Sequence, residues 1–552
     1  MADKDSVNAN RPSIDPITGF CAATKTFHSI RPTIPLPPLS LPLSSGSYSL
    51  SLLLSSSPLP SSPALIDSTS GQTLSYHDFI LRVQSLSSAL KPLLSRGQTA
   101  LILATPSLHI PVLYFSLLSL GVVVSPSNPA STPPEISRQI HISRPVIAFA
   151  TSASAPKLPP SLPTILLDSP LFLSMIAPRG ASVAVNPASD EPNQSDAAAI
   201  LYSSGTTGKI KGVVLTHRNI ISLLAGIYAV RQERAPPAVV LVTMPLFHMV
   251  GLFYCLKAVS MRETVVMMER FEVGKMVRAV DEFQVTHLSA APPVVLAMTK
   301  GDMVDPYRLR SLKWVLSGGA PLGKEVIERF KSRFPAVQLG QGYGMTETTG
   351  PIFRPTSPEE TQHYGSVGRL SAYMEVKIMD PATGIALPPC KQGELWVRGP
   401  TITRGYVGDE VATAAAFDSE GWLKTGDLCY MDNDGFLFVV DRLKELIKYK
   451  AYQVPPAELE HLLQSHPEIT EAAVIPYPDE EAGQVPMAFV VRKPQSTLDD
   501  KQVMDFVTKQ VAPYKKIRRV SFIDSIPKTA AGKILRKDLV KLATSASAPS
   551  KL

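Results

Sequence analysis

The sequence predicts an α/β protein with layered, largely parallel sheets, because short apolar runs alternate with helical patterns from residue 64 onward. The apolar runs have the length of buried strands, and the longer stretches between them repeat with the period of a helix. The predicted elements are a helix at 76–90, a strand at 99–104, a helix at 110–120, and strands at 122–125, 197–201, 213–215, 239–243 and 314–316, the last followed by a helix that ends near Arg333.

The length of the chain predicts more than one domain. At 552 residues it exceeds an ordinary single domain and has ample material for large hydrophobic cores. Residues 33–63 are rich in Pro, Ser and Leu, and this composition predicts a poorly structured lead-in before the first sheet. We therefore expect residues 1–63 to be a variable lead-in.

Composition excludes several kinds of partner. The net charge is +7, which suits anionic ligands, but no basic stripe is interleaved with aromatic residues, so no nucleic-acid partner is expected. The cysteines Cys21, Cys255, Cys390 and Cys429 are too widely spaced to predict a disulfide framework or a metal site. The longest apolar run, at 110–124, is interrupted by Pro and Gly and is too short for a transmembrane segment.

The chain ends in Ser550-Lys551-Leu552, a tripeptide that the peroxisomal import receptor binds at an extreme carboxyl terminus. A run of small residues, 543–549, precedes it and has little side chain to pack. Chance also produces such endings, but an exposed tail is what a receptor needs. We therefore expect localisation in the peroxisome, with the import receptor as a partner.

A polar loop at Tyr202–Gly212 joins two predicted strands and holds five hydroxyl side chains, three glycines and two lysines. Such a loop brings backbone N–H groups, hydroxyl donors and positive charge close to an oxyanion, so it favours a polyphosphate ligand. An ordinary surface turn is the alternative. The nucleotide P-loop is excluded, because only two residues separate Gly205 from Gly208 and Lys209 precedes Ile210.

Six further segments place glycines or charged residues beside predicted strands. Glycines at the carboxyl end of a strand let a flat ligand lie against the backbone, and a carboxylate such as Glu347 offers an oxygen to Mg²⁺. A core histidine or a solvated charge is the plainer interpretation of any one segment alone. The segments are Pro245–Gly251, Gly318–Pro321, Gln341–Glu347, Thr425–Asp427, Asp441–Lys448 and Pro527–Lys533.

Taken together, these segments resemble the adenylate-forming superfamily of acyl-CoA synthetases, luciferases and peptide-synthetase adenylation domains, and within it the plant 4-coumarate–CoA ligase-like proteins. The motifs occur in the family's order from about residue 60 onward. The resemblance implies a large N-terminal domain of layered β-sheets and helices at 64–440 and a small, mobile α+β C-terminal domain at 441–547. The tail at 548–552 would carry the targeting signal.

The resemblance also implies a two-step reaction. A carboxylate attacks the α-phosphorus of ATP in the presence of Mg²⁺, giving an acyl-AMP, and the thiol of coenzyme A then displaces AMP. Lys533 would bridge the carboxylate and the α-phosphate in the first step, and the C-terminal domain would then rotate about Lys444. The implied catalytic residues are Lys533, Lys448 and His248, and Glu347 would bind the metal.

Other residues are assigned by the same resemblance. ATP or AMP would be bound by Ser203, Ser204, Gly205, Thr206, Thr207, Lys209, Gly319, Ala320, Gln341, Gly342, Tyr343, Thr346, Asp427, Arg442, Lys444, Gln453 and Lys533. Coenzyme A would be bound by Arg270, Lys450 and Ala451. Many family members have glycine where this chain has Ala451, and a methyl group there restricts the backbone. We therefore expect Ala451 to adjust the closed state of the C-terminal domain without inactivating the enzyme.

The acyl pocket is implied at His248, Met249, Val250, Gly251, Leu316, Gly318, Gly342, Pro351 and Ile352. Hydroxycinnamate ligases tend to place a tyrosine near Val250 and a lysine near Leu316, where the phenol is bound. Both are aliphatic here, and a buried phenol without a partner costs about 1–3 kcal/mol. We therefore expect a medium or long fatty acid or a cyclopentanone-bearing jasmonate precursor, with cinnamate, 4-coumarate or benzoate as the alternative.

Other functions stay open from the sequence. A luciferase-like oxygenase and a loader of carrier proteins belong to the same superfamily, but no carrier domain follows Lys533. A non-catalytic, acyl-binding peroxisomal protein is the alternative from another class. Degenerate motifs would favour it, whereas Lys209, Glu347, Asp427 and Arg442 are all present. An enzyme is therefore the preferred hypothesis.

Overall fold

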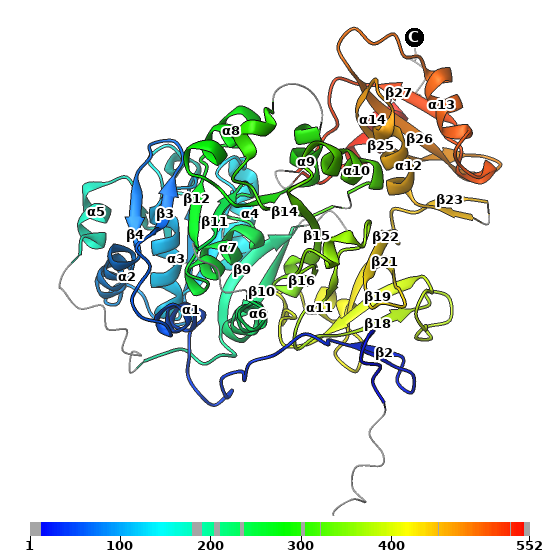
Figure 1. Ribbon diagram of the computed structural model, residues 1–552. Coiled ribbons are helices and arrows are strands. Elements are labelled where there is room, and N and C mark those ends of the chain that lie inside the picture. The colour runs from blue at the N-terminus through cyan, green and yellow to red at the C-terminus, as the bar shows by residue number, and fades with distance from the viewer. Residues whose placement is uncertain are drawn as a thin grey trace, which may run out of the picture.

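The computed structural model describes residues 13–178, 190–203, 210–231, 237–299, 304–320, 322–450, 452–529 and 532–545. It is a mixed α/β protein in which a large N-terminal domain of several sheets and helices is followed by a C-terminal domain with its own sheet (Figure 1). The predicted fold class is confirmed. The exact domain boundaries stay a prediction.

The first sheet of the large domain is mostly parallel. Its central strands β6, β5, β7 and β8 pair in parallel, and β10 and β20 add antiparallel strands at one edge. In spatial order its strands are β20 (Gly405–Tyr406), β10 (Lys211–Thr216), β9 (Ala197–Ser203), β6 (Val123–Pro126), β5 (Thr99–Leu103), β7 (Ile147–Ala150) and β8 (Thr164–Leu166).

The second sheet is parallel through its centre and antiparallel at both edges. Strand β14 runs beside β15, so the two segments that the sequence singled out for their glycines leave the sheet at the same end. In spatial order its strands are β17 (Arg369–Leu370), β16 (Gly350–Arg354), β15 (Gln338–Met345), β14 (Trp314–Gly318), β13 (His287–Ala290), β11 (Val239–Val242), β12 (Thr264–Met267), β3 (Pro63–Asp67) and β4 (Thr73–Ser75).

The third sheet is antiparallel throughout, which the expectation of largely parallel sheets did not include. Its longest strand alternates between buried and half-buried residues, as expected when a strand has one face on a core and one face nearer to solvent. In spatial order its strands are β1 (Phe20–Cys21), β2 (Thr26–His28), β18 (Glu375–Met379), β19 (Gly393–Arg398), β21 (Leu423–Met431) and β22 (Leu437–Arg442).

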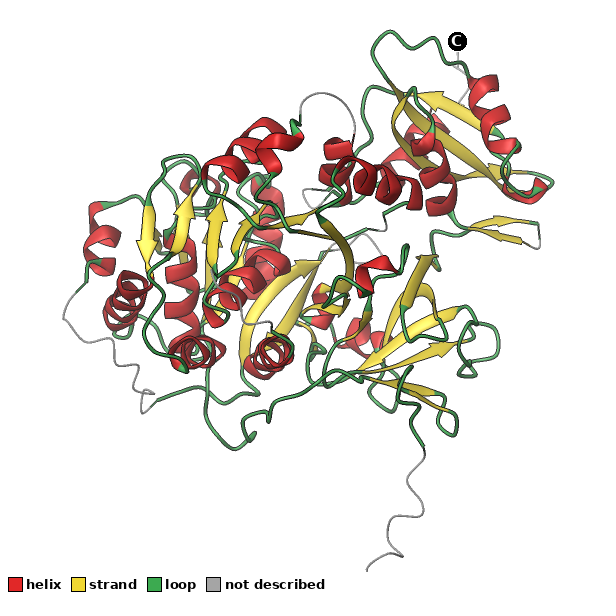
Figure 2. Cartoon of the chain, in the orientation of Figure 1, coloured by secondary structure: helices red, strands yellow, loops and turns green. Residues whose placement is uncertain are grey.

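Helices pack on the sheets of the large domain (Figure 2). Helix α2 has the predicted bounds, and the Ser75 hydroxyl accepts from the Asp78 N–H to cap its first turn. The helices are α1 (Ser45–Leu54), α2 (Tyr76–Leu90), α3 (His109–Ser119), α4 (Pro133–Ser143), α5 (Pro170–Ile176), α6 (His217–Ala229), α7 (Met249–Ser260), α8 (Val273–Glu282), α9 (Pro292–Thr299), α10 (Lys324–Arg333) and α11 (Glu410–Ala416), with 3₁₀ turns η1 (Ala155–Lys157), η2 (Pro306–Leu309), η3 (Thr346–Thr348) and η4 (Glu360–Gln362).

Helix α1 corrects the prediction of a poorly structured lead-in. Although residues 33–63 are rich in Ser and Pro, the Ser44 hydroxyl caps α1, and Tyr48, Leu50 and Leu53 are buried in the largest hydrophobic core. The helix packs against α3 and α7. Tertiary burial therefore outweighs the weak local preference of this segment.

The C-terminal domain is built on a separate sheet with two hydrophobic clusters of its own. Figure 1 shows it beside α9 and α10 of the large domain. Its strands are β23 (Ile447–Tyr449), β24 (Tyr452–Val454), β25 (Ile469–Asp479), β26 (Gly483–Arg492) and β27 (Arg519–Phe522), and its helices are α12 (Pro456–Ser465), α13 (Asp500–Thr508), η5 (Pro513–Lys515) and α14 (Arg536–Ser545).

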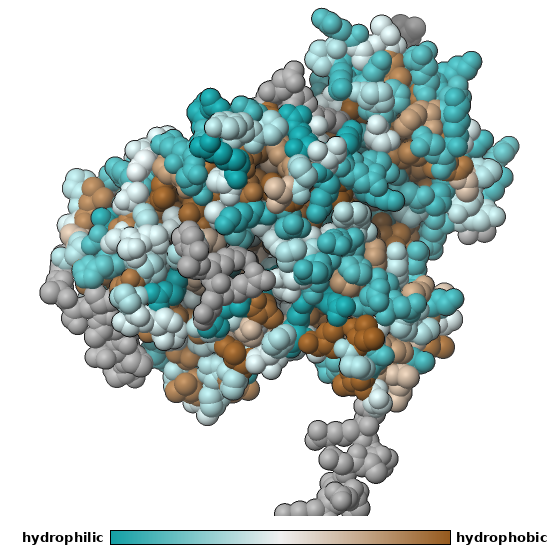
Figure 3. Space-filling model, in the orientation of Figure 1, coloured by the Kyte–Doolittle hydropathy of each residue, from teal (hydrophilic) through white to brown (hydrophobic). Residues whose placement is uncertain are grey.

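The surface agrees with this division between core and exterior. On the face drawn in Figure 3, hydrophilic residues predominate and hydrophobic residues form separate patches. Among the described residues, no helix combines the length and the hydropathy that crossing a membrane requires.

Candidate active site between the two domains

A cleft of about 380 Å³ lies between the large domain and the C-terminal domain. Residues of α9, of strands β15, β21 and β22, and of the segment after β14 line it from one side, and residues of α12, β25 and the segment before α14 line it from the other. The structure thereby brings together predicted residues that are more than 200 positions apart in the sequence. The predicted residues in its lining are Gly319, Ala320, Gly342, Tyr343, Asp427, Arg442 and Lys533.

Asp427 is the buried carboxylate of this cleft. It lies on β21 opposite Arg442 on β22, and the guanidinium Nε is 3.3 Å from its Oδ1. The Tyr343 hydroxyl donates to its Oδ2 at 2.6 Å. Burial raises the pKa of Asp427, while Arg442, the Tyr343 hydroxyl and Lys533 act in the opposite direction. These partners hold a carboxylate in the orientation needed to accept further hydrogen bonds.

Strands β14 and β15 form the flat part of the cleft. Gly319 follows β14 with φ +91° and has open space where a Cβ would lie, so backbone alone faces the cleft there. Gln341 is buried rather than exposed to the cleft: its Oε1 accepts from the Leu322 N–H at 2.8 Å. Gln341 therefore positions the segment after Ala320.

Lys533 reaches the cleft from the C-terminal domain on a tight loop. The Thr529 N–H donates to the Lys533 carbonyl at 2.8 Å, and the Lys533 N–H donates to the Thr529 hydroxyl at 3.1 Å. Burial and the nearby Arg442 lower the pKa of Lys533, whereas Glu445 and Asp427 raise it. The ammonium group thus lies in the same electrostatic environment as the buried Asp427.

Glu347 lies in a different part of the site, beside Ser203 at the end of β9. Its buried carboxylate accepts at Oε1 from the Ser203 hydroxyl at 3.3 Å and from the Tyr406 hydroxyl at 3.1 Å. No described residue donates to its Oε2. A single carboxylate with a free oxygen is the type of ligand that Mg²⁺ uses when a phosphate supplies the others, so these residues fit the predicted metal. Thr346 is the half-buried neighbour that opens η3.

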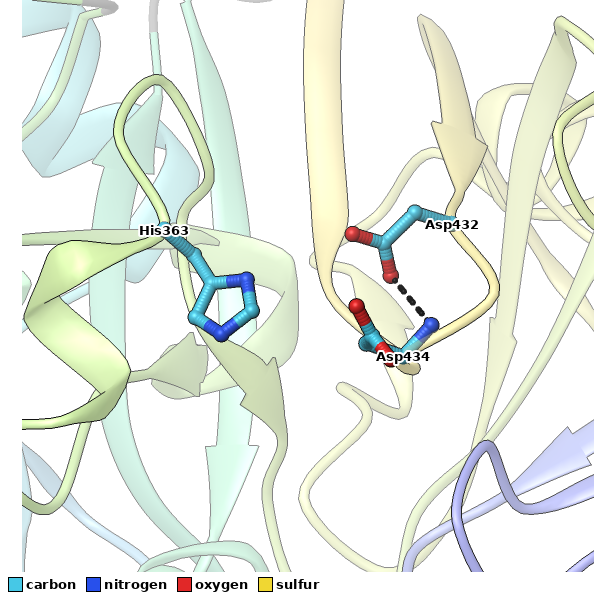
Figure 4. Close-up of side chains that lie close together, drawn as sticks. All are labelled: His363, Asp432 and Asp434. Atoms are coloured by element: carbon cyan, nitrogen blue, oxygen red, sulfur yellow. Dashed lines mark hydrogen bonds between the residues drawn. The ribbon is translucent and has the colours of Figure 1, made fainter.

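The described residues bring three other metal-binding side chains together, but elsewhere. His363, Asp432 and Asp434 have ligand atoms within 4.8 Å of one another (Figure 4). The N–H groups of Asp434 and Phe436 donate to Asp432 Oδ1, which closes the turn between β21 and β22. The His363 ring stacks on Phe436 with centroids 3.7 Å apart. These contacts account for the group as turn structure, and we assign no ion to it.

His248 caps helix α7 instead of standing free. Its Nδ1 accepts from the Val250 N–H at 3.3 Å, and burial lowers its pKa. A neutral ring that accepts at Nδ1 carries its proton on Nε2, which remains able to donate. Gly251 is needed in the same turn, because a Cβ there would lie 2.4 Å from the Pro245 carbonyl oxygen. Met249 is buried beside them.

A second cavity of about 460 Å³ lies inside the large domain. Leu316 and Pro351 of the predicted acyl pocket line it, together with aromatic residues that the sequence did not single out: Tyr228, Phe253, Tyr254 and Trp314. Gly318, the last residue of β14, is in the lining of neither cavity. Ile352 does not belong to this lining, because its side chain is fully buried in the core that contains Phe353.

Several predicted residues lie away from the cleft in this arrangement. Lys448, Lys450 and Gln453 are exposed on the hairpin of β23 and β24, and Arg270 is exposed before α8. Lys444 is nearer to the site: partial burial lowers its pKa to about 8, and the charges of Arg442 and Lys533 contribute. The predicted residues Ser204, Gly205, Thr206, Thr207, Lys209, Ala451 and Ser550-Lys551-Leu552 lie outside the described residues.

Comparison with known proteins decides the family. A model of the AMP-binding enzyme family matches residues 56–407, and a model of the AMP-binding enzyme C-terminal domain matches residues 458–533. The chain belongs to the AMP-binding enzyme family. The resemblance inferred from the motifs is confirmed.

The relatives narrow the activity of this AMP-binding enzyme. Arabidopsis thaliana 4-coumarate–CoA ligase-like 9 is 52% identical over 551 residues, covering 97% of this chain and 98% of that protein. Arabidopsis thaliana peroxisomal OPC-8:0-CoA ligase 1 is 45% identical, covering 97% of this chain and 99% of that protein. ATP-bound MatB from Rhodopseudomonas palustris superposes with a TM-score of 0.81 at 25% identity, covering 92% and 100%. The chain is an adenylate-forming acid–thiol ligase, as the motifs predicted.

Among the residues that sequence reasoning missed is Tyr406. Tyr406 on β20 donates to Glu347, and the Lys211 ammonium lies 4.4 Å from the centre of its ring. Nothing near Tyr406 in the sequence signals this role, because the pairing of β20 with β10 alone brings it to Glu347.

Proposed function

We propose that the protein is a peroxisomal carboxylate–CoA ligase that forms acyl-CoA, through an acyl-AMP, from a medium or long fatty acid or a cyclopentanone-bearing jasmonate precursor. The observation that carries the proposal is the second cavity, whose lining includes the aliphatic Leu316 where hydroxycinnamate ligases tend to have a lysine. Its volume of about 460 Å³ falls in the range typical of small-molecule sites.

In the proposed roles, the cleft binds the nucleotide. Asp427 accepts from the ribose hydroxyls with Arg442 beside it, while the adenine lies against Gly319, Ala320 and Tyr343. The loop from Ser203 to Lys209, with Ser204, Gly205, Thr206 and Thr207, binds the outer phosphates. Thr346 donates to the α-phosphate. Mg²⁺, when bound through Glu347, supplies positive charge to the phosphate oxygens.

Adenylation requires stabilisation of negative charge as the carboxylate oxygen attacks the α-phosphorus. We assign this to Lys533, whose ammonium group faces Asp427 and Arg442 across the cleft. The Nε2–H of His248 is the matching donor for the substrate carboxylate. A lysine suits a role in which the charge must later leave, since it binds as a point charge on a flexible stem.

The second step needs a different face of the C-terminal domain. Lys448, Lys450 and Gln453 are exposed while Lys533 faces the cleft, so the arrangement corresponds to the adenylation state. We propose that rotation about Lys444 withdraws Lys533 and brings this hairpin, with Ala451, to the site. Arg270 would then contact coenzyme A. In this proposal the rotation determines which of the two steps can occur, and it does not accelerate the chemistry of either step.

Two observations bear on the acid and on the location. A relative of similar length is named peroxisomal OPC-8:0-CoA ligase 1, and this chain ends in Ser550-Lys551-Leu552. The alternative, a cinnamate, 4-coumarate or benzoate ligase, is favoured by the names of other relatives. The aliphatic Val250 and Leu316 favour the apolar acid.

A panel of carboxylic acids tests the proposal. The purified full-length chain is assayed for AMP production that depends on coenzyme A, with fatty acids, cyclopentanone-bearing acids, cinnamate, 4-coumarate and benzoate. We expect the highest kcat/KM for a fatty acid or a cyclopentanone-bearing acid. Highest turnover of 4-coumarate would refute the substrate assignment, and no turnover of any acid would support the non-catalytic alternative.

A further inference from the structure

The second cavity contains a cation that the proposed function does not use. Arg354 is the last residue of β16 and lines this cavity. Its guanidinium donates no hydrogen bond to any residue in the described part of the chain. Arginine side chains this deep in a protein are normally paired, because an ionised group loses its water there. An arginine without such a partner indicates that the cavity holds one when it is occupied.

The carboxylates near Arg354 are already engaged. Glu360 forms a two-point ion pair with Arg31, with contacts of 2.5 and 2.7 Å, and Glu263 is paired with Lys257. Burial lowers the pKa of the Arg354 guanidinium to about 10, Arg31 adds to this, and Glu360 and Glu263 oppose it. Among the described residues that line the cavity, Glu263 is the one carboxylate, and it is paired with Lys257, so Arg354 has no carboxylate of its own there.

The position of Arg354 connects it with the reaction centre. A Cβ on Gly342, which lines the nucleotide cleft, would lie 3.9 Å from the Arg354 Cβ and 4.0 Å from the Leu316 Cδ1. Arg354 and Leu316 both line the second cavity. Gly342 therefore lines the cleft within contact distance of two residues of the second cavity, so the two spaces adjoin at this glycine.

We infer that Arg354 binds an oxygen atom carried by the acyl chain beyond its reactive carboxylate, so the enzyme selects oxygen-bearing aliphatic acids over plain fatty acids of equal length. The inference rests on the proposed function and makes its substrate class narrower. A keto, hydroxyl or second carboxylate group has the required acceptor, and Leu316, Phe253 and Trp314 are among the apolar residues that line the cavity for the rest of the chain.

The test compares decanoic acid, its (ω−1)-oxo derivative and decanedioic acid as substrates of the full-length protein. We expect the wild type to use an oxygen-bearing acid with a kcat/KM about tenfold or more above that of decanoic acid, with most of the difference in KM. A greater preference for the diacid would show that Arg354 binds an anionic group of the substrate, and a greater preference for the oxo acid would show that it binds a neutral one. Equal use of all three acids would overturn the inference while leaving the ligase activity established.

Variants separate Arg354 from a general effect of charge. Arg354→Met should remove the preference for the oxygen-bearing acid, and Arg354→Lys should restore part of it. Arg231→Met removes the same charge from the exposed edge of the cavity, where the guanidinium stacks on Tyr228, and should retain the preference. An unchanged preference for the oxygen-bearing acid in the Arg354→Met variant would contradict the inference. If that variant does not fold, the wild-type ranking and Arg354→Lys decide.

If the wild type activates no acid at all, the proposed function itself fails, and the inference about Arg354 fails with it. This outcome differs from equal activation of the three acids, which refutes only the role of Arg354.

Discussion

The two cavities of this protein are built in different ways. Five of the predicted motifs contribute residues to the cleft between the domains, which we propose binds the nucleotide. Its central carboxylate has partners: Asp427 is bonded to Tyr343 and paired with Arg442. The second cavity, which we propose binds the acyl chain and call the acyl cavity, is lined by single residues from many elements. Its Arg354 has no hydrogen-bond partner among the described residues. The carboxylate of the cleft therefore has its partners before the acid binds, whereas the arginine of the acyl cavity has no hydrogen-bond partner among the described residues.

This difference suggests that the cleft determines the reaction with ATP and that the acyl cavity determines which acid is used. Groups that stabilise charge on ATP must have fixed orientations before the substrate arrives, so each is held by neighbours within the cleft. Groups that select the acid contact only the substrate, and their partners are missing until it binds. A change in the cleft should therefore affect every acid equally, whereas a change in the cavity should alter the order of preference.

The largest expected effect comes from Lys533→Ala. Loss of the ammonium should slow acyl-AMP formation by about 10²–10³-fold with every acid, because no other group replaces its charge. Pyrophosphate release measures this step, and turnover of supplied acyl-AMP with coenzyme A should persist. Lys541→Ala, at an exposed position of α14, is the matched control. Undiminished pyrophosphate release would show that Lys533 is not the bridging group.

An alkaline loss of adenylation should follow from the same residue. The pKa of Lys533 is lowered from 10.5, chiefly by burial, so the ammonium form and the rate should be lost as pH rises through a value below 10.5. Beyond that pKa the rate should fall about tenfold per pH unit. The substitution Lys533→Arg keeps a charged group at this position throughout that range, so any activity retained by the variant should lack the alkaline loss.

Lys444 is the control for this pH profile, since its pKa is lowered to about 8 beside Arg442 and Lys533. Lys444→Arg removes that titration and should leave the loss caused by Lys533 in place. If the alkaline loss of adenylation rate disappears in Lys444→Arg but persists in Lys533→Arg, the titrating group is Lys444.

The smallest expected effect lies in the acyl cavity. Val250→Tyr combined with Leu316→Lys should raise the preference for 4-coumarate over a fatty acid about five- to tenfold, since the phenol gains a hydrogen-bond partner. The ratio of kcat/KM values measures the preference, and pyrophosphate release with the better acid serves as the control for the cleft. An unchanged ratio would mean that these two positions do not contact the distal end of the acid.

Much of the fold followed from local patterns. The helix at Tyr76–Leu90 was predicted with the bounds it has in the structure, and the strand at 99–104 within one residue, because both have a clear apolar period. Helix α1 was missed, since its serines and the prolines on either side of it obscure an apolar face that only packing against α3 and α7 makes stable. The antiparallel third sheet was missed as well, because strand direction depends on pairing between distant segments.

By itself, the sequence determined the family and singled out Asp427, Arg442 and Lys533, which line the cleft, because chemistry on ATP requires fixed residue types at fixed spacing. The tertiary structure decided which of these residues meet and what else joins them. It brought Lys533 to Asp427, placed Tyr406 on Glu347, and left Arg354 without a hydrogen-bond partner among the described residues of the acyl cavity. The reason is physical: burial and pairing depend on neighbours that are distant along the chain, and no local pattern encodes them.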